Sequence, residues 1–294
     1  MRATGQLFAL LALLALGAAE LRPASTRLAK SLGASSRRRI FHESCAIAAG
    51  CLLAGAQRVS ASVTGDDFRS RFKYEQPSDF VNYLREAVPQ KGDADAVLRA
   101  MDEFANYYPM YKLSPLKASI LTTAVRKASP TTVLEIGSFF GYSAIHLLRT
   151  TSAQGSSVTC LEGNEQNVAV MRAVLDHAFG ASSETLTRLH IVPGLSSDSI
   201  KLMPQKPQFD FVFLDHEKSC YLPDLRLLEA RGLLAPRCTV VADNVIFPGT
   251  PDYLSYVSSG GGWNTVIESA PFERIGFETK YQVVDDGMSI STKV

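Results

Sequence analysis

The sequence predicts an α/β fold built on a mostly parallel sheet. Short apolar runs rich in β-branched and aromatic residues alternate with longer segments in which leucines recur at helical spacing. The clearest runs are Phe209–Leu214 and Thr239–Ala242, and the leucines between them, such as Leu225 and Leu228, suit a helix with one buried side. Parallel strands joined by crossover helices produce this alternation, because such strands are buried on both faces.

Polar residues follow both of these runs directly. Asp215 and His216 come after the first run, and Asp243 and Asn244 come after the second. Ligands of open α/β sheets bind beyond the carboxyl ends of the strands, so we expect these side chains on one rim. Carboxylate and amide oxygens suit a hard cation such as Mg²⁺. Asp215, Asp243 and Asn244 are therefore candidate Mg²⁺ ligands, and ordinary acids at strand ends are the alternative.

Helices are expected before the first strand. From Ser78 onwards, apolar residues at helical spacing on both sides of a Pro-Gly interruption predict two short helices. Ser114 and Pro115 are typical of an N-cap and a first helical residue. A third helix should therefore run to about Lys127, with Leu116 on its buried side.

The first strand is expected at Val133–Ile136, followed by a glycine-containing turn and a helix that starts near Tyr142. Gly137 and Gly141 let the backbone approach a ligand closely, and the free N–H groups of a helix start favour a carboxylate or phosphate. The spacing of these glycines differs from the GxGxxG pattern of dinucleotide-binding proteins.

A second strand, Ser157–Leu161, ends at Glu162, an acid placed to accept hydrogen bonds from a ribose diol. A helix over Glu165–Phe179 and a third strand, Leu189–Val192, follow. The third strand leads into a polar loop at residues 193–198 that could edge an adenine. This order of features is typical of a nucleoside-binding methyltransferase sheet.

Residues 1–61 are expected to form a targeting leader. Leu7–Leu16 resembles a secretory signal, Leu21–Arg39 is rich in Arg and Ser like a transit peptide, and Ala46–Ala56 follows three arginines as in a twin-arginine signal. Signals in this series predict a plastid that is entered through the secretory route, with the thylakoid lumen as the destination. The alternative is a protein of the secretory pathway or one tethered to a membrane. Residues 62–294 would then form a single domain.

The charge is distributed unevenly. Eight basic and two acidic residues precede Ser62, while the full chain carries a net charge of +1. The body is therefore mildly acidic, which argues against nucleic acid as its main partner.

Four segments of the body match one enzyme family. They read VLEIGSFFGYSA from Val133, FVFLDHEKSCYLPD from Phe211, LLEARGLL from Leu227 and ADNVIFPGTPDYLSYV from Ala242. On these motifs the chain resembles the catechol O-methyltransferases, which are class I S-adenosylmethionine-dependent methyltransferases. The resemblance implies a Rossmann-like, doubly wound, mostly parallel sheet of seven strands, with helices on both faces and an antiparallel last strand. It also implies a monomer that acts on a small molecule, has S-adenosyl-L-methionine and Mg²⁺ as cofactors, and has no stable membrane span in its mature form.

The resemblance also assigns roles to residues. Cofactor-binding roles fall on Glu135, Gly137, Gly141, Tyr142, Ser143, Glu162, Ser196 and His216. The metal ligands are again Asp215, Asp243 and Asn244. Lys218 matches the general base, and Glu273 matches the carboxylate that binds the second hydroxyl of the substrate. Glu278 is the alternative for that carboxylate, because an insertion follows. Lys117 matches a family lysine near the site, although a solvated helix residue is an equal alternative.

The chain departs from the family at the substrate slot. Glu217 and Pro109 stand where tryptophans are expected, and the single tryptophan is Trp263. The slot should therefore be more open and more acidic, which suits a catecholamine or another amine-bearing phenol. The leading hypothesis is a Mg²⁺-dependent methyltransferase that modifies one hydroxyl of a catechol-like diphenol. The alternatives are a non-catalytic assembly or interaction protein and an enzyme for bulkier hydroxycinnamoyl or polyphenol substrates.

Overall fold

The computed structural model describes residues 65–151, 155–274 and 282–294. These residues belong to one compact unit, Val63–Val294. The predicted leader, residues 1–61, lies outside the described residues. Within the described ranges, no helix combines the length and the apolar character that crossing a membrane requires.

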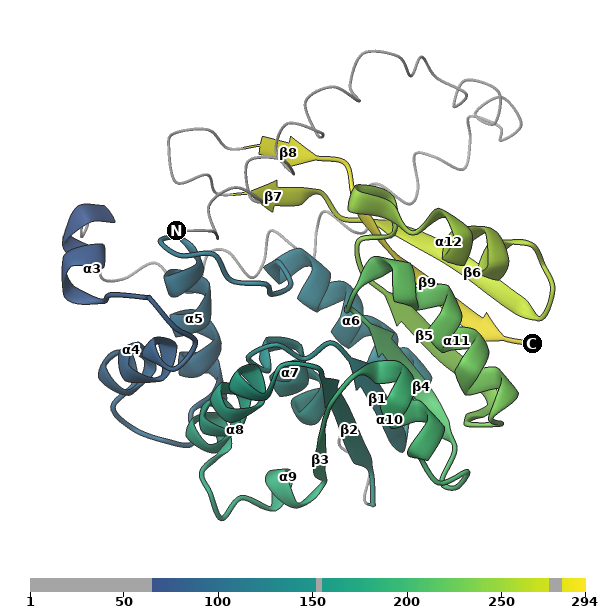
Figure 1. Ribbon diagram of the computed structural model, residues 1–294, viewed down its shortest axis with the longest axis horizontal. Helices are drawn as coiled ribbons and strands as arrows, with labels where there is room; N and C mark the ends of the chain where they lie inside the picture. The colour runs from purple at the N-terminus through teal and green to yellow at the C-terminus, as the bar shows by residue number, and fades with distance from the viewer. Residues whose placement is uncertain (1–64, 152–154, 275–281) are drawn as a thin grey trace, which may run out of the picture. The chain divides into compact units, whose positions relative to one another are not determined.

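A seven-stranded sheet with the order β3-β2-β1-β4-β5-β9-β6 forms the centre of the unit (Figure 1). Its strands are β1 (Thr132–Ile136), β2 (Ser157–Glu162), β3 (Leu189–Pro193), β4 (Phe209–Leu214), β5 (Leu234–Ala242), β6 (Trp263–Ser269) and β9 (Gly287–Lys293). Strands β1 to β5 are parallel, whereas β9 is antiparallel to both β5 and β6. The prediction of a mostly parallel sheet with an antiparallel last strand is confirmed. A small second sheet, which was not predicted, pairs β7 (Phe272–Arg274) with β8 (Gln282–Val284).

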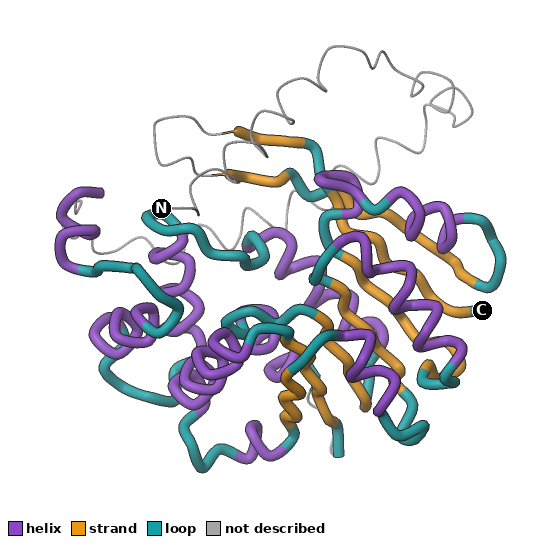
Figure 2. Tube along the Cα trace, viewed as in Figure 1, coloured by secondary structure: helices purple, strands orange, loops and turns teal. Residues whose placement is uncertain are grey.

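Helices cover both faces of the large sheet (Figure 2). The described helices are α3 (Gly65–Arg71), α4 (Asp79–Ala87), α5 (Ala94–Ala105), α6 (Pro115–Ala128), α7 (Tyr142–Thr150), α8 (Glu165–Phe179), α9 (Glu184–Thr187), α10 (Ser196–Leu202), α11 (Tyr221–Ala230) and α12 (Pro251–Ser258). Buried side chains of α6, α7 and α8 form one core layer with the sheet, and those of α10, α11 and α12 form the other. The predicted N-cap of α6 is confirmed, since the side chain of Ser114 accepts a hydrogen bond from the Lys117 amide.

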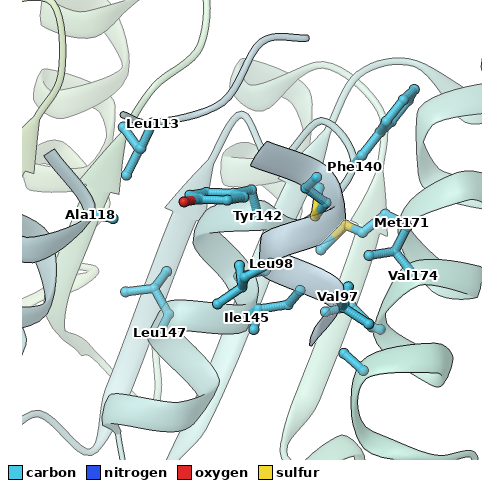
Figure 3. Packing of buried hydrophobic residues seen from close by; sticks show 14 of the residues in the cluster. Val97, Leu98, Leu113, Ala118, Phe140, Tyr142, Ile145, Leu147, Met171 and Val174 are labelled. Atoms are coloured by element: carbon cyan, nitrogen blue, oxygen red, sulfur yellow. The ribbon is translucent and has the colours of Figure 1, made fainter. Parts of the chain in front are cut away.

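Alternate residues of the strands supply the two core layers. Val133 of β1 packs in the first layer, whereas Leu134 and Ile136 pack in the second. Figure 3 shows the first layer, in which Met171 of α8 and Leu98 of α5 pack with residues of α7. Full burial of a side chain of this size contributes about 1.5–3 kcal/mol, so a slip of one residue in the strand register would be costly.

The register brings the carboxyl ends of three neighbouring strands level with one another. Ile136 of β1 is paired with Leu214 of β4, and Leu214 is paired with Ala242 of β5. The backbone amide of Asp215 donates to the carbonyl of Ile136 over 2.9 Å, and that of Asp243 donates to the carbonyl of Leu214 over 3.0 Å. The residues that follow β4 and β5 therefore begin side by side on one rim.

Two local predictions are wrong. Residues 196–198 were expected in a loop, but they begin the helix α10, whose Ile200 is fully buried against the sheet. Leu116 was expected on the buried side of α6, but it is 51% exposed, while its neighbour Lys117 is 3% exposed. A prediction from hydrophobic periodicity puts leucine on the buried side of a helix and lysine on the exposed side. At Lys117 the opposite holds, because its ammonium pairs with two acidic residues that are distant in the sequence.

Candidate active site

The turn after β1 packs directly against the end of β4. Gly137 has a φ of +91°, and a Cβ atom at this position would lie 2.4 Å from the carbonyl oxygen of Asp215. Gly141 has a φ of +87° and precedes the first residue of α7. Only glycine adopts such φ values without strain and also allows this approach. The two glycines therefore hold the turn beside the rim that carries Asp215.

We expect the substitution Gly137→Ala to lower the free energy of unfolding by about 2–5 kcal/mol, because a left-handed conformation and a forced displacement of packed backbone are both unfavourable. Gly232→Ala is the matched control. Its φ is +65°, but apart from its chain neighbours no atom of the described residues lies within 4 Å of the position that the new methyl group would take. The control should lose only the conformational part, about 1–2 kcal/mol. Urea unfolding of both variants measures the difference, and equal losses would contradict the close approach.

Side chains of the same turn are buried beneath it. Glu135 is fully buried, and its Oε2 accepts a hydrogen bond from the Ser138 hydroxyl over 2.7 Å. Burial raises the pKa of Glu135, against the opposing effect of the Ser143 and Ser138 hydroxyls. The ring of Tyr142 lies in the core layer of Figure 3. These buried side chains therefore help to hold the turn in place.

Glu162 joins the ends of β1 and β2. Its Oε2 accepts from the Phe139 amide over 2.8 Å, and its Oε1 accepts from the Asn164 amide over 2.9 Å. Phe139 has a φ of +46°, an uncommon value for a residue other than glycine. A carboxylate can accept about four hydrogen bonds. Since the Asn167 side chain is the third donor, at 3.2 Å, Glu162 retains capacity for a ribose hydroxyl.

His216 is held by an acidic residue that the sequence did not single out. Its Nε2 lies 2.9 Å from Oδ2 of the buried Asp224, and its ring stacks on Tyr221 with the centroids 5.0 Å apart. Its Nδ1 is buried and has no hydrogen-bond partner among the residues that the structure describes.

Ser196, the other residue predicted to contact the adenine, is the first residue of α10, and α10 contacts both β2 and α11.

Asp215 and Asp243 repel each other on the rim. Burial raises the pKa of Asp215 to about 7, with a further increase from Asp243 and a partial decrease from the ammonium of Lys218. Burial likewise raises the pKa of Asp243, against the effect of Lys117. Ionisation of both carboxyl groups is therefore unfavourable in the metal-free protein. A bound divalent cation would favour the ionised form of both.

Lys218 lies between one of these acids and a buried phenol. Its Nζ is 3.0 Å from Oδ1 of Asp215 and 2.8 Å from the hydroxyl of Tyr221. The Tyr221 hydroxyl in turn donates to the backbone carbonyl of Asp243 over 3.1 Å. The ammonium is therefore fixed at the rim by contacts that involve both β4 and β5.

Lys117 and Asp286 form a buried network beneath the other acid. The Nζ of Lys117 lies 2.6 Å from Oδ1 of Asp243 and 2.6 Å from Oδ2 of Asp286. Burial alone would lower the pKa of Lys117, but the two acids outweigh it and raise the pKa. Asn244 donates from its Nδ2 to Oδ2 of Asp286 over 2.9 Å. The alternative of a solvated Lys117 is wrong.

The predicted metal ligands fit a hard cation. Asp215 and Asp243 adjoin in register, each of the two lysines contacts the Oδ1 atom of its carboxylate, and the nitrogen of the Asn244 amide is committed to Asp286. The donor set is therefore two carboxylates and an amide oxygen, which suits Mg²⁺. In the described part of the chain, no group of three acidic, histidine or cysteine side chains is arranged to hold a metal.

The remaining predicted residues lie elsewhere. Glu273 is in β7, opposite Val283 of β8, and both its side chain and the whole of Glu278 lie outside what the structure describes. Trp263 begins β6 and is 4% exposed within the core. Glu217 is exposed, and its side chain accepts from the Ser219 amide. Trp263 therefore does not substitute for the tryptophan that the family resemblance predicts at the position of Glu217.

Comparison with known proteins identifies the family. A family model described as a methyltransferase domain matches residues 134–245. Catechol O-methyltransferase B of Danio rerio is 33% identical over 215 residues, which cover 71% of this chain and 76% of that protein. The chain belongs to the catechol O-methyltransferase family. A probable O-methyltransferase of Mycobacterium tuberculosis is 36% identical over 62% of this chain and 79% of its own length. The protein is thus an S-adenosylmethionine-dependent O-methyltransferase, and the alternative of a non-catalytic protein is not favoured.

Solved structures agree with the fold of this methyltransferase. An O-methyltransferase from Bacillus cereus in complex with SAH gives a TM-score of 0.54 at 20% identity, covering 72% of this chain and 96% of that one. The O-methyltransferase TomG from Streptomyces achromogenes in complex with SAM gives a TM-score of 0.52 at 18% identity, covering 76% and 98%. At this identity the likeness concerns the fold alone.

Sequence reasoning missed three residues that contact the predicted site: Tyr221, Asp224 and Asp286. The first two had a detectable signal, since they follow Lys218 and His216 by three and eight positions within one matched motif. Asp286 had none, because it lies 42 positions after the Asn244 that it contacts.

Proposed function

We propose that the protein transfers a methyl group, in a Mg²⁺-dependent reaction, to one hydroxyl of a catechol-like diphenol. One observation carries this proposal. Asp215 and Asp243 adjoin in register at the ends of β4 and β5, with Asn244 next to them and the ammonium of Lys218 on the first carboxylate. Two neighbouring phenol oxygens need a cation to favour ionisation and a base to accept the proton, and this rim offers groups for both tasks.

The residues of the chain divide the work between binding and proton transfer. S-adenosylmethionine supplies an activated methyl group, and a bound divalent cation supplies positive charge that favours the ionised phenol. Once its ammonium has released a proton to solvent, Lys218 would accept the phenol proton at its Nζ, while Asp215 and Tyr221 keep that atom at the rim. Glu162 would hold the ribose, and His216 would lie against the adenine. These contacts would align the methyl carbon with the phenol oxygen, which is the main remaining requirement of the transfer.

The residues at positions 217 and 263 favour a polar diphenol as substrate. Glu217 is exposed directly between His216 and Lys218, and Trp263 is buried away from solvent. A carboxylate at this point would attract an amine on the substrate, so we propose amine-bearing catechols as the preferred class. Bulkier hydroxycinnamoyl or polyphenol substrates are the second candidate, which the replacement of an expected tryptophan by the exposed Glu217 favours.

Turnover of labelled S-adenosylmethionine by the purified protein tests this function. The panel contains catechol, a catecholamine, a hydroxycinnamoyl diphenol and, as the matched control, the monophenol analogue of each. We expect methylation of diphenols with Mg²⁺ and none with EDTA, and we expect restoration when Mg²⁺ is added in excess. Turnover that persists in EDTA, or equal turnover of monophenols, would overturn the proposal.

A further inference from the structure

Asp286 is a buried carboxylate whose two oxygens are fully engaged. The residue is 1% exposed and lies between β8 and β9. Its Oδ2 accepts from Nζ of Lys117 over 2.6 Å and from Nδ2 of Asn244 over 2.9 Å. Its Oδ1 accepts from the backbone amides of Ile246 and Phe247 over 3.3 and 3.0 Å. Four donors match the capacity of a carboxylate, so the position of this group is determined by its surroundings.

The first consequence concerns the orientation of the Asn244 amide. An amide group has a donor end and an acceptor end, and the contact with Asp286 engages the donor end. The carbonyl oxygen is then the end that remains for a cation. Asn244 also has a φ of +57°, and the backbone amides of Ile246 and Phe247, which follow Asn244, donate to Asp286. Asp286 thus orients both the side chain of Asn244 and the turn in which Asn244 lies.

The second consequence concerns the charge next to Asp243. Lys117 is shared equally, at 2.6 Å from each of Asp243 and Asp286. Without the charge of Asp286, the ammonium would pair with Asp243 alone and would compete there with a cation. With it, the three buried groups carry a net negative charge, which favours cation binding.

From these contacts we infer that Asp286 is the positioning residue of the metal site: it directs the oxygen of Asn244 toward the cation and prevents Lys117 from neutralising Asp243. This inference rests on the proposed Mg²⁺ dependence and assigns a residue that lies outside the matched motifs. Partners of metal ligands in other proteins have this effect, and their loss weakens metal affinity by about 10–100-fold.

The substitution Asp286→Asn tests this assignment, with Mn²⁺ as the probe and its EPR signal as the readout, in the absence of substrate. The new amide would keep an oxygen for the backbone amides, and its nitrogen would then face Lys117 and the nitrogen of Asn244. We expect the Mn²⁺ dissociation constant to rise about 10–100-fold. Binding of S-adenosylhomocysteine should persist. The control Asp210→Asn removes a carboxylate at the opposite end of β4, where it accepts from Thr131 and Thr132, and it should leave Mn²⁺ affinity unchanged.

A reciprocal exchange separates positioning from simple structural support. In the double variant Asp286→Asn/Asn244→Asp, the amide donates to the carboxylate and the total charge is that of the natural protein. We expect the second substitution to restore the Mn²⁺ affinity that Asp286→Asn loses. This gain should exceed any gain that Asn244→Asp produces in the natural protein, because the two positions are coupled. If Asp286→Asn loses S-adenosylhomocysteine binding and is therefore misfolded, this double variant decides.

The outcomes distinguish the inference from the proposed function. A natural protein that binds no Mn²⁺ would overturn the proposed metal dependence itself. A natural protein that binds Mn²⁺ while Asp286→Asn binds it equally well would overturn only the role of Asp286. A folded double variant without recovery would do the same.

Discussion

Asp215→Ala should reduce metal-dependent turnover by roughly 10³-fold or more, since metal-ion catalysis contributes several kcal/mol and each 1.36 kcal/mol is a factor of ten. Nζ of Lys218 contacts the carboxylate of Asp215. The substitution therefore removes a negative charge that would face the cation and also removes a contact of the proposed base. Affinity for S-adenosylhomocysteine should persist, because the predicted cofactor contacts are made by other residues. Single-turnover rates and calorimetric titration of the cofactor product measure the two quantities.

Two further variants control this experiment. Asp95→Ala removes a surface carboxylate that pairs with Arg149 and should leave turnover unchanged. Asp215→Asn keeps the shape of the side chain and should behave like Asp215→Ala in turnover. Loss of cofactor binding together with turnover would contradict a metal-ligand role and indicate collapse of the rim.

The same position predicts a pH dependence of stability. Burial raises the pKa of Asp215 to about 7 from an ordinary value of 3.8, so the native state binds this proton more tightly than the unfolded state. The ionised carboxylate therefore destabilises the metal-free protein above pH 7, and this effect disappears as the pH falls toward 3.8. Metal-free Asp215→Asn should accordingly unfold at higher denaturant concentration than the natural protein above pH 7 and lose that advantage in acid.

Lys218→Met should lower kcat by about 10²–10⁴-fold, the range expected for a general base. The natural side chain is fixed by Asp215 and by the Tyr221 hydroxyl, and methionine retains the length but not the nitrogen. Mn²⁺ affinity should stay equal or increase, because the substitution removes a positive charge next to Asp215. A variant that had lost a metal ligand would instead bind Mn²⁺ more weakly. The Mn²⁺ affinity therefore distinguishes loss of a base from loss of the metal.

The exposed Lys127 in the last turn of α6 offers the control Lys127→Met, which should match the natural protein. Steady-state kinetics at saturating cofactor and metal measure the effect. A decrease of less than tenfold in kcat for Lys218→Met, or a change confined to KM, would show that another group accepts the proton.

Local sequence patterns predicted most of the fold correctly. The limits Phe209–Leu214 and Glu165–Phe179 agree with β4 and α8 residue for residue. The first is an apolar run, interrupted only by Asp210, that suits a strand buried on both faces, and the second begins after Asn164, whose side chain caps the helix. β5 was predicted too short because Leu234 to Cys238 contains the exposed residues Pro236 and Arg237, a pair that is not typical of a buried strand.

The sequence by itself determined β1 to β4, the end of β5, the glycine turn at Gly137 and the acids that follow β4 and β5, because each depends on neighbours in the chain. Only the tertiary structure decided that Lys117 is buried and that Asp286 joins it. These two residues are 169 positions apart, and their interaction arises where β9 packs beside β5. Burial of a charge is favourable only when an opposite charge is brought to it, and no local pattern contains that information.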